Sequence, residues 1–176
     1  VHTSDDRGRA WTHRVDVAMI DCFPFVAGES VYVVGGRHDL TIIRSDDLGT
    51  TWTPPVKLTE GKLWYCHPGS AVFAKGRIYF VMEQIMEPID RGFPTHAFAP
   101  IVLSARTSDD LTQPDAWTFS NALSFQDVLR ENDEPNLLGV PFYSSGRYQH
   151  PTSNRNMAPI GWGEANLVQI ADPDNI

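Results

Sequence analysis

Short apolar runs separated by turn-forming residues dominate this chain. Residues 30–35 and 77–83 alternate apolar and polar positions or run apolar over a few residues, as β strands do. The turns Gly28-Glu29 and Lys75-Gly76 directly precede these two runs. Long helical patterns are few, and 13 Gly, 13 Pro and five Trp agree with many turns. The pattern therefore predicts an all-β protein.

A spaced motif occurs twice in the chain. Its two copies are Ser4, Asp6, Gly8 and Trp11, and then Ser45, Asp47, Gly49 and Trp52. In such a turn the Asp carboxylate accepts backbone N–H groups, and the Gly takes a positive φ. We expect the Trp to cover the turn and to lock the hairpin through a large apolar burial. A third, degraded copy runs from Ser108 through Asp110 to Trp117, with no Gly and two extra residues.

This motif resembles the Asp-box, or BNR repeat, of the sialidase (neuraminidase) superfamily, whose general form is Ser-x-Asp-x-Gly-x-Thr-Trp. The second copy matches it fully, and the first departs only at Ala10. The interval of 41 residues between Ser4 and Ser45 fits one four-stranded propeller blade. The resemblance implies a β-propeller fragment of about three four-stranded antiparallel blades, from a six-bladed propeller.

The blade length divides the chain. We assign residues 1–18 to the end of one blade, 19–58 to a second, 62–123 to a third, 124–161 to a long inter-blade insertion and 162–176 to the start of a fourth. The expected strands are 21–26, 30–35 and 40–44 in the second blade, 67–74, 77–83, 101–105 and one from Trp117 in the third, and 163–170 in the fourth. A long loop at 84–96 separates two of them. Because a motif copy begins almost at Val1, we expect an internal fragment of a longer protein.

Charge and composition exclude several partners. A net charge of -8 disfavours nucleic acid and anionic membranes, and no apolar run is long enough for a spanning helix. Cys22 and Cys66 fit no zinc motif, and we expect neither a metal nor a cofactor. The two thiols occupy equivalent places in neighbouring blades, so they are either bonded or, more simply, buried and free. The sequence leaves the compartment open, and the resemblance is compatible with a secreted or periplasmic protein.

Propeller geometry places the motif turns on one side and the long loops on the other. The side away from the motif turns then gathers polar residues near the axis, as a carbohydrate pocket would. The residues expected to bind the sugar are Arg37, His38, Asp39, Tyr65, His67, Glu83 and Asn166. For each of these residues taken singly, hydrogen bonds to loop backbone or to water are the simpler explanation of its polarity. For Arg37, binding of a carboxylate and a surface ion pair are equally open.

The resemblance adds a catalytic candidate, Glu164. Its segment, 162–168, is similar to the sialidase segment whose Glu activates a Tyr nucleophile in a retaining mechanism, a step that needs a base because a phenol has a pKa near 10. Asp39 resembles the family's acid/base Asp in local position, but it lies in the second blade. The family's Tyr nucleophile and arginine triad are expected outside this chain, so these 176 residues alone should be inactive.

Three functions remain open. The first is a sialidase-like exo-glycosidase acting on terminal sugars of glycoconjugates, with sialic acid as the expected sugar. The second is a non-catalytic Asp-box propeller that binds glycan or protein, and the third is an enzyme acting on a different polysaccharide.

Overall fold

The computed structural model describes residues 1–36, 38–65, 69, 71–86, 97–124, 148–149, 156–157 and 163–170. These residues are all-β: the strands pair antiparallel, and the only described helix is one 3₁₀ turn, η2 (Pro114–Ala116). None of the described segments is a helix with the length and apolar character needed to cross a bilayer. The prediction of an all-β chain is confirmed.

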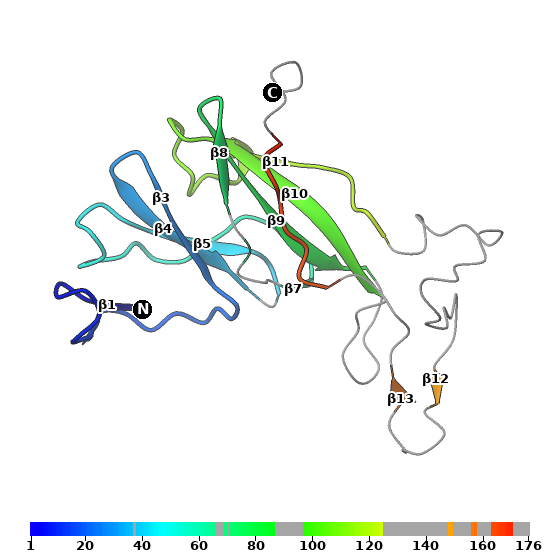
Figure 1. Ribbon diagram of the computed structural model, residues 1–176, viewed down its shortest axis with the longest axis horizontal. Coiled ribbons are helices and arrows are strands. Elements are labelled where there is room, and N and C mark those ends of the chain that lie inside the picture. The colour runs from blue at the N-terminus through cyan, green and yellow to red at the C-terminus, as the bar shows by residue number, and fades with distance from the viewer. Residues whose placement is uncertain are drawn as a thin grey trace.

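The first large sheet is an antiparallel meander (Figure 1). Its strands, in order across the sheet, are β3 (Phe23–Ala27), β4 (Ser30–Gly35), β5 (Thr41–Ser45) and β6 (Val56–Lys57). Gly28, with a φ of 61°, makes the tight turn between the first two strands. The predicted strand at 30–35 has the observed bounds, whereas the preceding strand starts at Phe23 and not at Asp21. Asp21 has a φ of 50°, which an extended strand does not allow.

The second large sheet repeats this order. It contains β7 (Trp64–Tyr65), β8 (Val72–Ala74), β9 (Arg77–Ile85), β10 (Phe98–Arg106) and β11 (Trp117–Phe119). Strands β7 and β8 both pair with β9, at its two ends, so together they occupy the position of a first strand beside it. That strand begins at Trp64, earlier than the predicted 67–74, because Trp64 and Tyr65 pair with Gln84 and Glu83. Strands β9 and β10 also extend further than predicted because they pair along their whole length.

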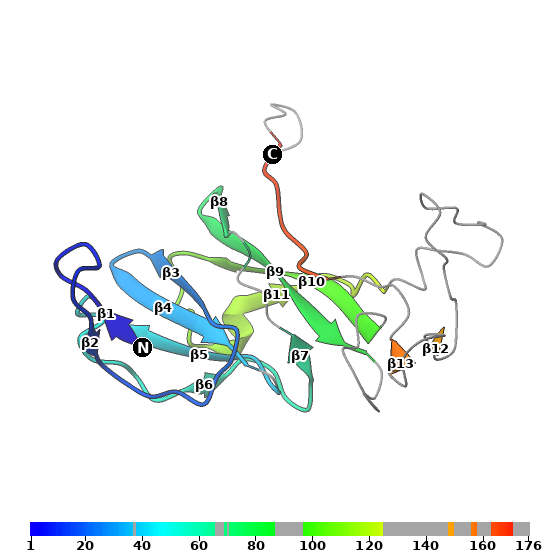
Figure 2. The ribbon, with the colours of Figure 1, turned by 60° about the horizontal axis from the view of Figure 1, so that its bottom comes forward.

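Smaller elements complete the described chain. The first motif turn lies inside a hairpin of β1 (His2–Thr3) and β2 (Thr12–His13), and β12 (Tyr148–Gln149) pairs with β13 (Asn156–Met157). The predicted strand at 163–170 is wrong, because this segment has no strand conformation. A strand needs a hydrogen-bonded neighbour, and none of the described strands pairs with it. In Figure 2 it leads away from the second large sheet, and its residues Val168 and Ile170 are 83% and 75% exposed.

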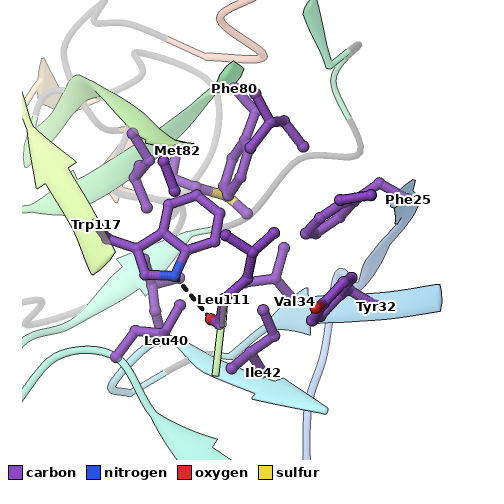
Figure 3. Packing of buried hydrophobic residues seen from close by; sticks show 14 of the residues in the cluster. Phe25, Tyr32, Val34, Leu40, Ile42, Phe80, Met82, Leu111 and Trp117 are labelled. Atoms are coloured by element: carbon purple, nitrogen blue, oxygen red, sulfur yellow. Dashed lines mark hydrogen bonds between the residues drawn. The ribbon is translucent and has the colours of Figure 1, made fainter. Parts of the chain in front are cut away.

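The two large sheets pack face to face around one hydrophobic core (Figure 3). Phe25 of β3 lies 6.1 Å from Phe80 of β9 between ring centroids, and Phe80 meets Trp117 of β11 edge to face at 5.3 Å. Tyr32 stacks on Phe25 at 5.2 Å. Burying each such side chain stabilises the fold by about 1.5–3 kcal/mol, so this aromatic layer fixes how the sheets are joined.

The hairpin turns and the motif turns lie at one end of the sheets. The Thr107 N–H, just after β10, donates to the carbonyl of Gly76 over 2.9 Å, and Ser30 beside the Gly28 turn donates to Asp46 of the second motif over 2.6 Å. The opposite end holds the starts of β3 and β7 and the end of β9. The predicted separation of motif turns from the polar strand ends is therefore confirmed for the described residues.

Candidate functional site

The second motif copy is a closed network of hydrogen bonds. Asp47 accepts bonds from the Ser45 hydroxyl at 2.9 Å, the Thr51 N–H at 2.8 Å and the Thr51 hydroxyl at 2.7 Å. The Ser45 oxygen accepts the Gly49 N–H at 2.7 Å, and the indole of Trp52 donates to the Gly49 carbonyl at 3.0 Å. The bonds that Asp47 itself accepts, with those from Thr51 foremost, lower its pKa to about 2. Its carboxylate is engaged within the turn.

The first copy has the same geometry. Asp6 accepts the Ser4 hydroxyl at 2.8 Å and the N–H groups of Arg9 and Ala10 at 2.9 Å each. Gly8 and Gly49 have φ values of 84° and 86°, which is the positive φ that the sequence predicted. A Thr side chain is not required at Ala10, because the backbone alone supplies the bond at that position.

The tryptophans behave differently from the prediction. The Trp11 indole donates to the Gly8 carbonyl at 3.2 Å, yet the side chain is 63% exposed, so the expected large burial is wrong for this copy. Trp52 is half-buried. In both copies the indole covers its own turn and not the sheet core. Only in the degraded copy is the Trp a core residue: Trp117 is 5% exposed and donates to the Leu111 carbonyl at 2.8 Å (Figure 3).

At the other end of the second sheet lies a buried carboxylate, Glu83. It is 2% exposed, near the end of β9, and lies opposite Tyr65 in the strand register. Its Oε1 accepts the backbone N–H of Ala165 at 3.0 Å. Strand pairing thus brings Tyr65 to Glu83, and this bond brings the segment containing Glu164 to both.

Tyr65 is the centre of a group of negative charges. Its ring stacks on Phe98 of β10 with centroids 4.9 Å apart. Burial raises the pKa of its phenol, and so do the nearby charges of Asp21, Glu83 and Glu164. At neutral pH the phenol keeps its proton, so it serves as a hydrogen-bond donor and is a poor nucleophile.

Glu164 has an unusual backbone. Its φ is 58°, although it is not a glycine, and its side chain is exposed. The Asn166 side-chain amide donates to the Glu164 carbonyl at 3.3 Å. The Asn166 oxygen also lies 3.0 Å from the place that a Cβ on Gly69 would take, so a side chain at Gly69 would press on it. The predicted residues Tyr65, Glu83, Glu164 and Asn166 are therefore brought together.

Asp39 lies in a different environment. Its carboxylate accepts the Lys62 N–H at 3.0 Å and the Thr59 hydroxyl at 3.2 Å, and it pairs with Lys57 at 3.3 Å. The Lys62 N–H is the main cause of its lowered pKa. Asp39 thus holds the connection between the two large sheets, residues 58–63, and its carboxylate oxygens are engaged in these bonds. Its role in sugar binding stays a prediction that this geometry does not favour.

The remaining predicted residues are placed as follows. His38 is exposed beside Asp39. Arg37 and His67 lie outside the described residues, as does Cys66. Cys22 is a half-buried free thiol, and its sulfur lies 3.1 Å from where a Cβ on Gly35 would be.

Asp21 belongs to the polar strand starts that the sequence placed near the axis, although it is not among the residues named as sugar-binding. The structure brings its charge close to Tyr65. The signal for it was its position, since it directly precedes the first strand of its sheet, as Tyr65 belongs to the first strand of the other.

A groove of about 430 Å³ opens on the opposite face of β9. Gln84, next to Glu83 in sequence, faces it, and so does Phe119 of β11. The lining residues are Thr59, Glu60, Lys62, Trp64, Gln84, Met86, Ile101, Phe119, Ser120 and Ala122. It is separate from the Tyr65 group.

Within the described residues, no group of three or more His, Cys, Asp or Glu side chains is arranged to hold a metal ion. The chain matches no protein-family model and no curated protein sequence. Function therefore rests on the residues themselves.

Proposed function

We propose that the chain belongs to a sialidase-like exo-glycosidase built as a β-propeller, and that it contributes Glu164 to the catalytic centre. The observation that carries this proposal is the convergence of Glu164 with Tyr65 and Glu83 at the end of the sheets opposite the motif turns. Two facing antiparallel meanders, the first with the second motif turn between its third and fourth strands (β5 and β6), support the propeller.

In this proposal each residue has a distinct task. Glu164 is exposed, so solvent or a sugar can reach it, and it acts as the base that removes a proton from the nucleophile. Tyr65 keeps its proton and donates a hydrogen bond to a sugar oxygen. Because the pKa of Tyr65 is raised, the nucleophilic Tyr of a sialidase mechanism would be another residue.

The charge around Tyr65 supports a second candidate. Three carboxylates close to one phenol repel an anionic sugar unless guanidinium groups offset them. A neutral terminal sugar would meet no such repulsion. A glycosidase for a neutral sugar is thus the alternative to a sialidase at the same site.

The test is kinetic and uses the full-length protein with fluorogenic sialosides and neutral aryl glycosides. Glu164→Gln should lower kcat by about 10² or more, since general acid–base catalysis contributes roughly 10²–10⁴-fold. The matched control is Glu60→Gln, which removes one exposed carboxylate from the groove and should leave kcat unchanged.

Each outcome separates the candidates. Turnover of sialosides alone supports the sialidase, and turnover of neutral glycosides alone supports the second candidate. An unchanged kcat in Glu164→Gln would remove this residue from the mechanism. Binding of a glycan or a protein with no turnover of either substrate class would indicate a non-catalytic propeller.

A further inference from the structure

Glu83 is a carboxylate placed inside the protein, which is costly unless polar groups satisfy it. Its Oε1 accepts the N–H of Ala165, 82 residues away in sequence, at 3.0 Å. With 2% of its surface exposed, Glu83 offers almost no area to a sugar. From this buried position Glu83 contacts the 163–170 segment.

That contact fixes the residue next to it. Glu164 has a φ of 58°, and a non-glycine residue keeps such a backbone only where its surroundings hold it. The Ala165 N–H is held by Glu83 on one side, and the Glu164 carbonyl accepts the Asn166 amide on the other. Both bonds act on the peptide group that joins Glu164 to Ala165, so they help to set the direction of the Glu164 side chain.

We propose that Glu83 is a positioning residue: it orients Glu164 through the Ala165 N–H and does not bind the sugar. This inference rests on the proposed function of Glu164. What it requires of residue 83 is a hydrogen-bond acceptor, not a negative charge.

Two substitutions separate acceptor from charge in the full-length protein. Glu83→Gln keeps an acceptor oxygen of nearly the same shape, so kcat should stay within about threefold, given one retained hydrogen bond. Glu83→Met keeps the length of the side chain but removes the acceptor. Its kcat should fall by about tenfold to 10²-fold with little change in KM, because misplacing a catalytic group by about 1 Å has this effect.

A double-mutant cycle distinguishes positioning from general structural support. In a Glu164→Gln background, Glu83→Met should lower kcat no further, because its only route to the chemistry is already removed. A merely structural role would lower kcat by the same factor in both backgrounds. Equal factors would overturn the proposal.

Amide hydrogen exchange gives a readout that needs no turnover. The Ala165 N–H should exchange at least about tenfold faster in Glu83→Met than in the wild type, and at the wild-type rate in Glu83→Gln. Gln84→Met is the matched control, since residue 84 faces the groove on the other side of β9 and should leave the Ala165 rate unchanged.

The outcomes of the two proposals remain distinct. If the wild type turns over no glycoside but the exchange rates follow this pattern, the proposed function fails and the anchoring by Glu83 stands. If Glu83→Met does not fold, Glu83→Gln still decides: a tenfold or larger loss of kcat with unchanged Ala165 protection would show that the charge matters, and would overturn the proposal. An unchanged Ala165 rate in a folded Glu83→Met would do the same.

Discussion

Gly49 of the second motif offers a sharp test of how the first hairpin joins the first large sheet. A Cβ at this position would lie 2.9 Å from the Thr3 methyl carbon of β1, closer than real Cβ contacts, and Gly49 has a φ of 86°. Gly49→Ala therefore meets two costs. The positive φ costs about 1–2 kcal/mol, and the forced contact adds about 1–3 kcal/mol.

Two controls isolate the contact. Gly8→Ala has the same turn and a φ of 84°, but its nearest neighbour is a Trp11 ring carbon at an ordinary 3.6 Å. Gly28→Ala has a φ of 61° and nothing within 4 Å. In both variants the free energy of unfolding should fall only by the cost of the positive φ, about 1–2 kcal/mol. The excess for Gly49→Ala then measures the packing of Thr3 on the turn.

Urea unfolding followed by tryptophan fluorescence gives these free energies of unfolding. Thr3→Ser removes the methyl group and keeps the hydroxyl that accepts a bond from Arg14 at 2.7 Å. It should recover most of the excess in a Thr3→Ser, Gly49→Ala double variant. Equal losses for Gly49→Ala and Gly28→Ala, or no recovery by Thr3→Ser, would refute the contact between hairpin and sheet.

Three further outcomes follow from charges and burial. The pKa of Asp47 is lowered from 3.8 to about 2, so its contribution to the free energy of unfolding is complete above pH 3.8 and is lost as the pH falls towards 2. In Asp47→Asn the urea midpoint should therefore fall less steeply with decreasing pH over this range. Burial raises the pKa of the Cys22 thiol, so its reaction with a disulfide reagent at neutral pH should be slower than that of a small-molecule thiol. The reaction that disappears in Cys22→Ala belongs to this thiol, and an equal rate would contradict the prediction. Arg44 pairs with Asp46 at 2.7 Å and with Asp110 at 3.5 Å on the surface. Arg44→Met should therefore lower the free energy of unfolding by only about 0–1 kcal/mol in the same urea assay, and by less at high salt. A decrease well above about 1 kcal/mol would contradict the surface character of the pairs.

The sequence by itself determined the parts of this protein that depend on near neighbours. The two motif turns close through bonds between residues two to four apart, such as Ser45 to Asp47 and Asp47 to Thr51. Bonds over such short separations need no partner from another element, so the turns could be predicted. The same spacing could not predict that Trp11 stays exposed, because the burial of an indole depends on which other parts of the chain pack against it.

Tertiary structure decided the site. Asp39 follows the second strand of the first large sheet and Glu83 lies near the end of the second strand of the other, yet Asp39 accepts the Lys62 N–H and Glu83 accepts the Ala165 N–H. Their partners lie 23 and 82 residues away, and no local pattern specifies which backbone N–H reaches a carboxylate across such a distance. Local hydrogen bonds thus fixed the turns, whereas the neighbours of Glu164 were set only when the sheets packed.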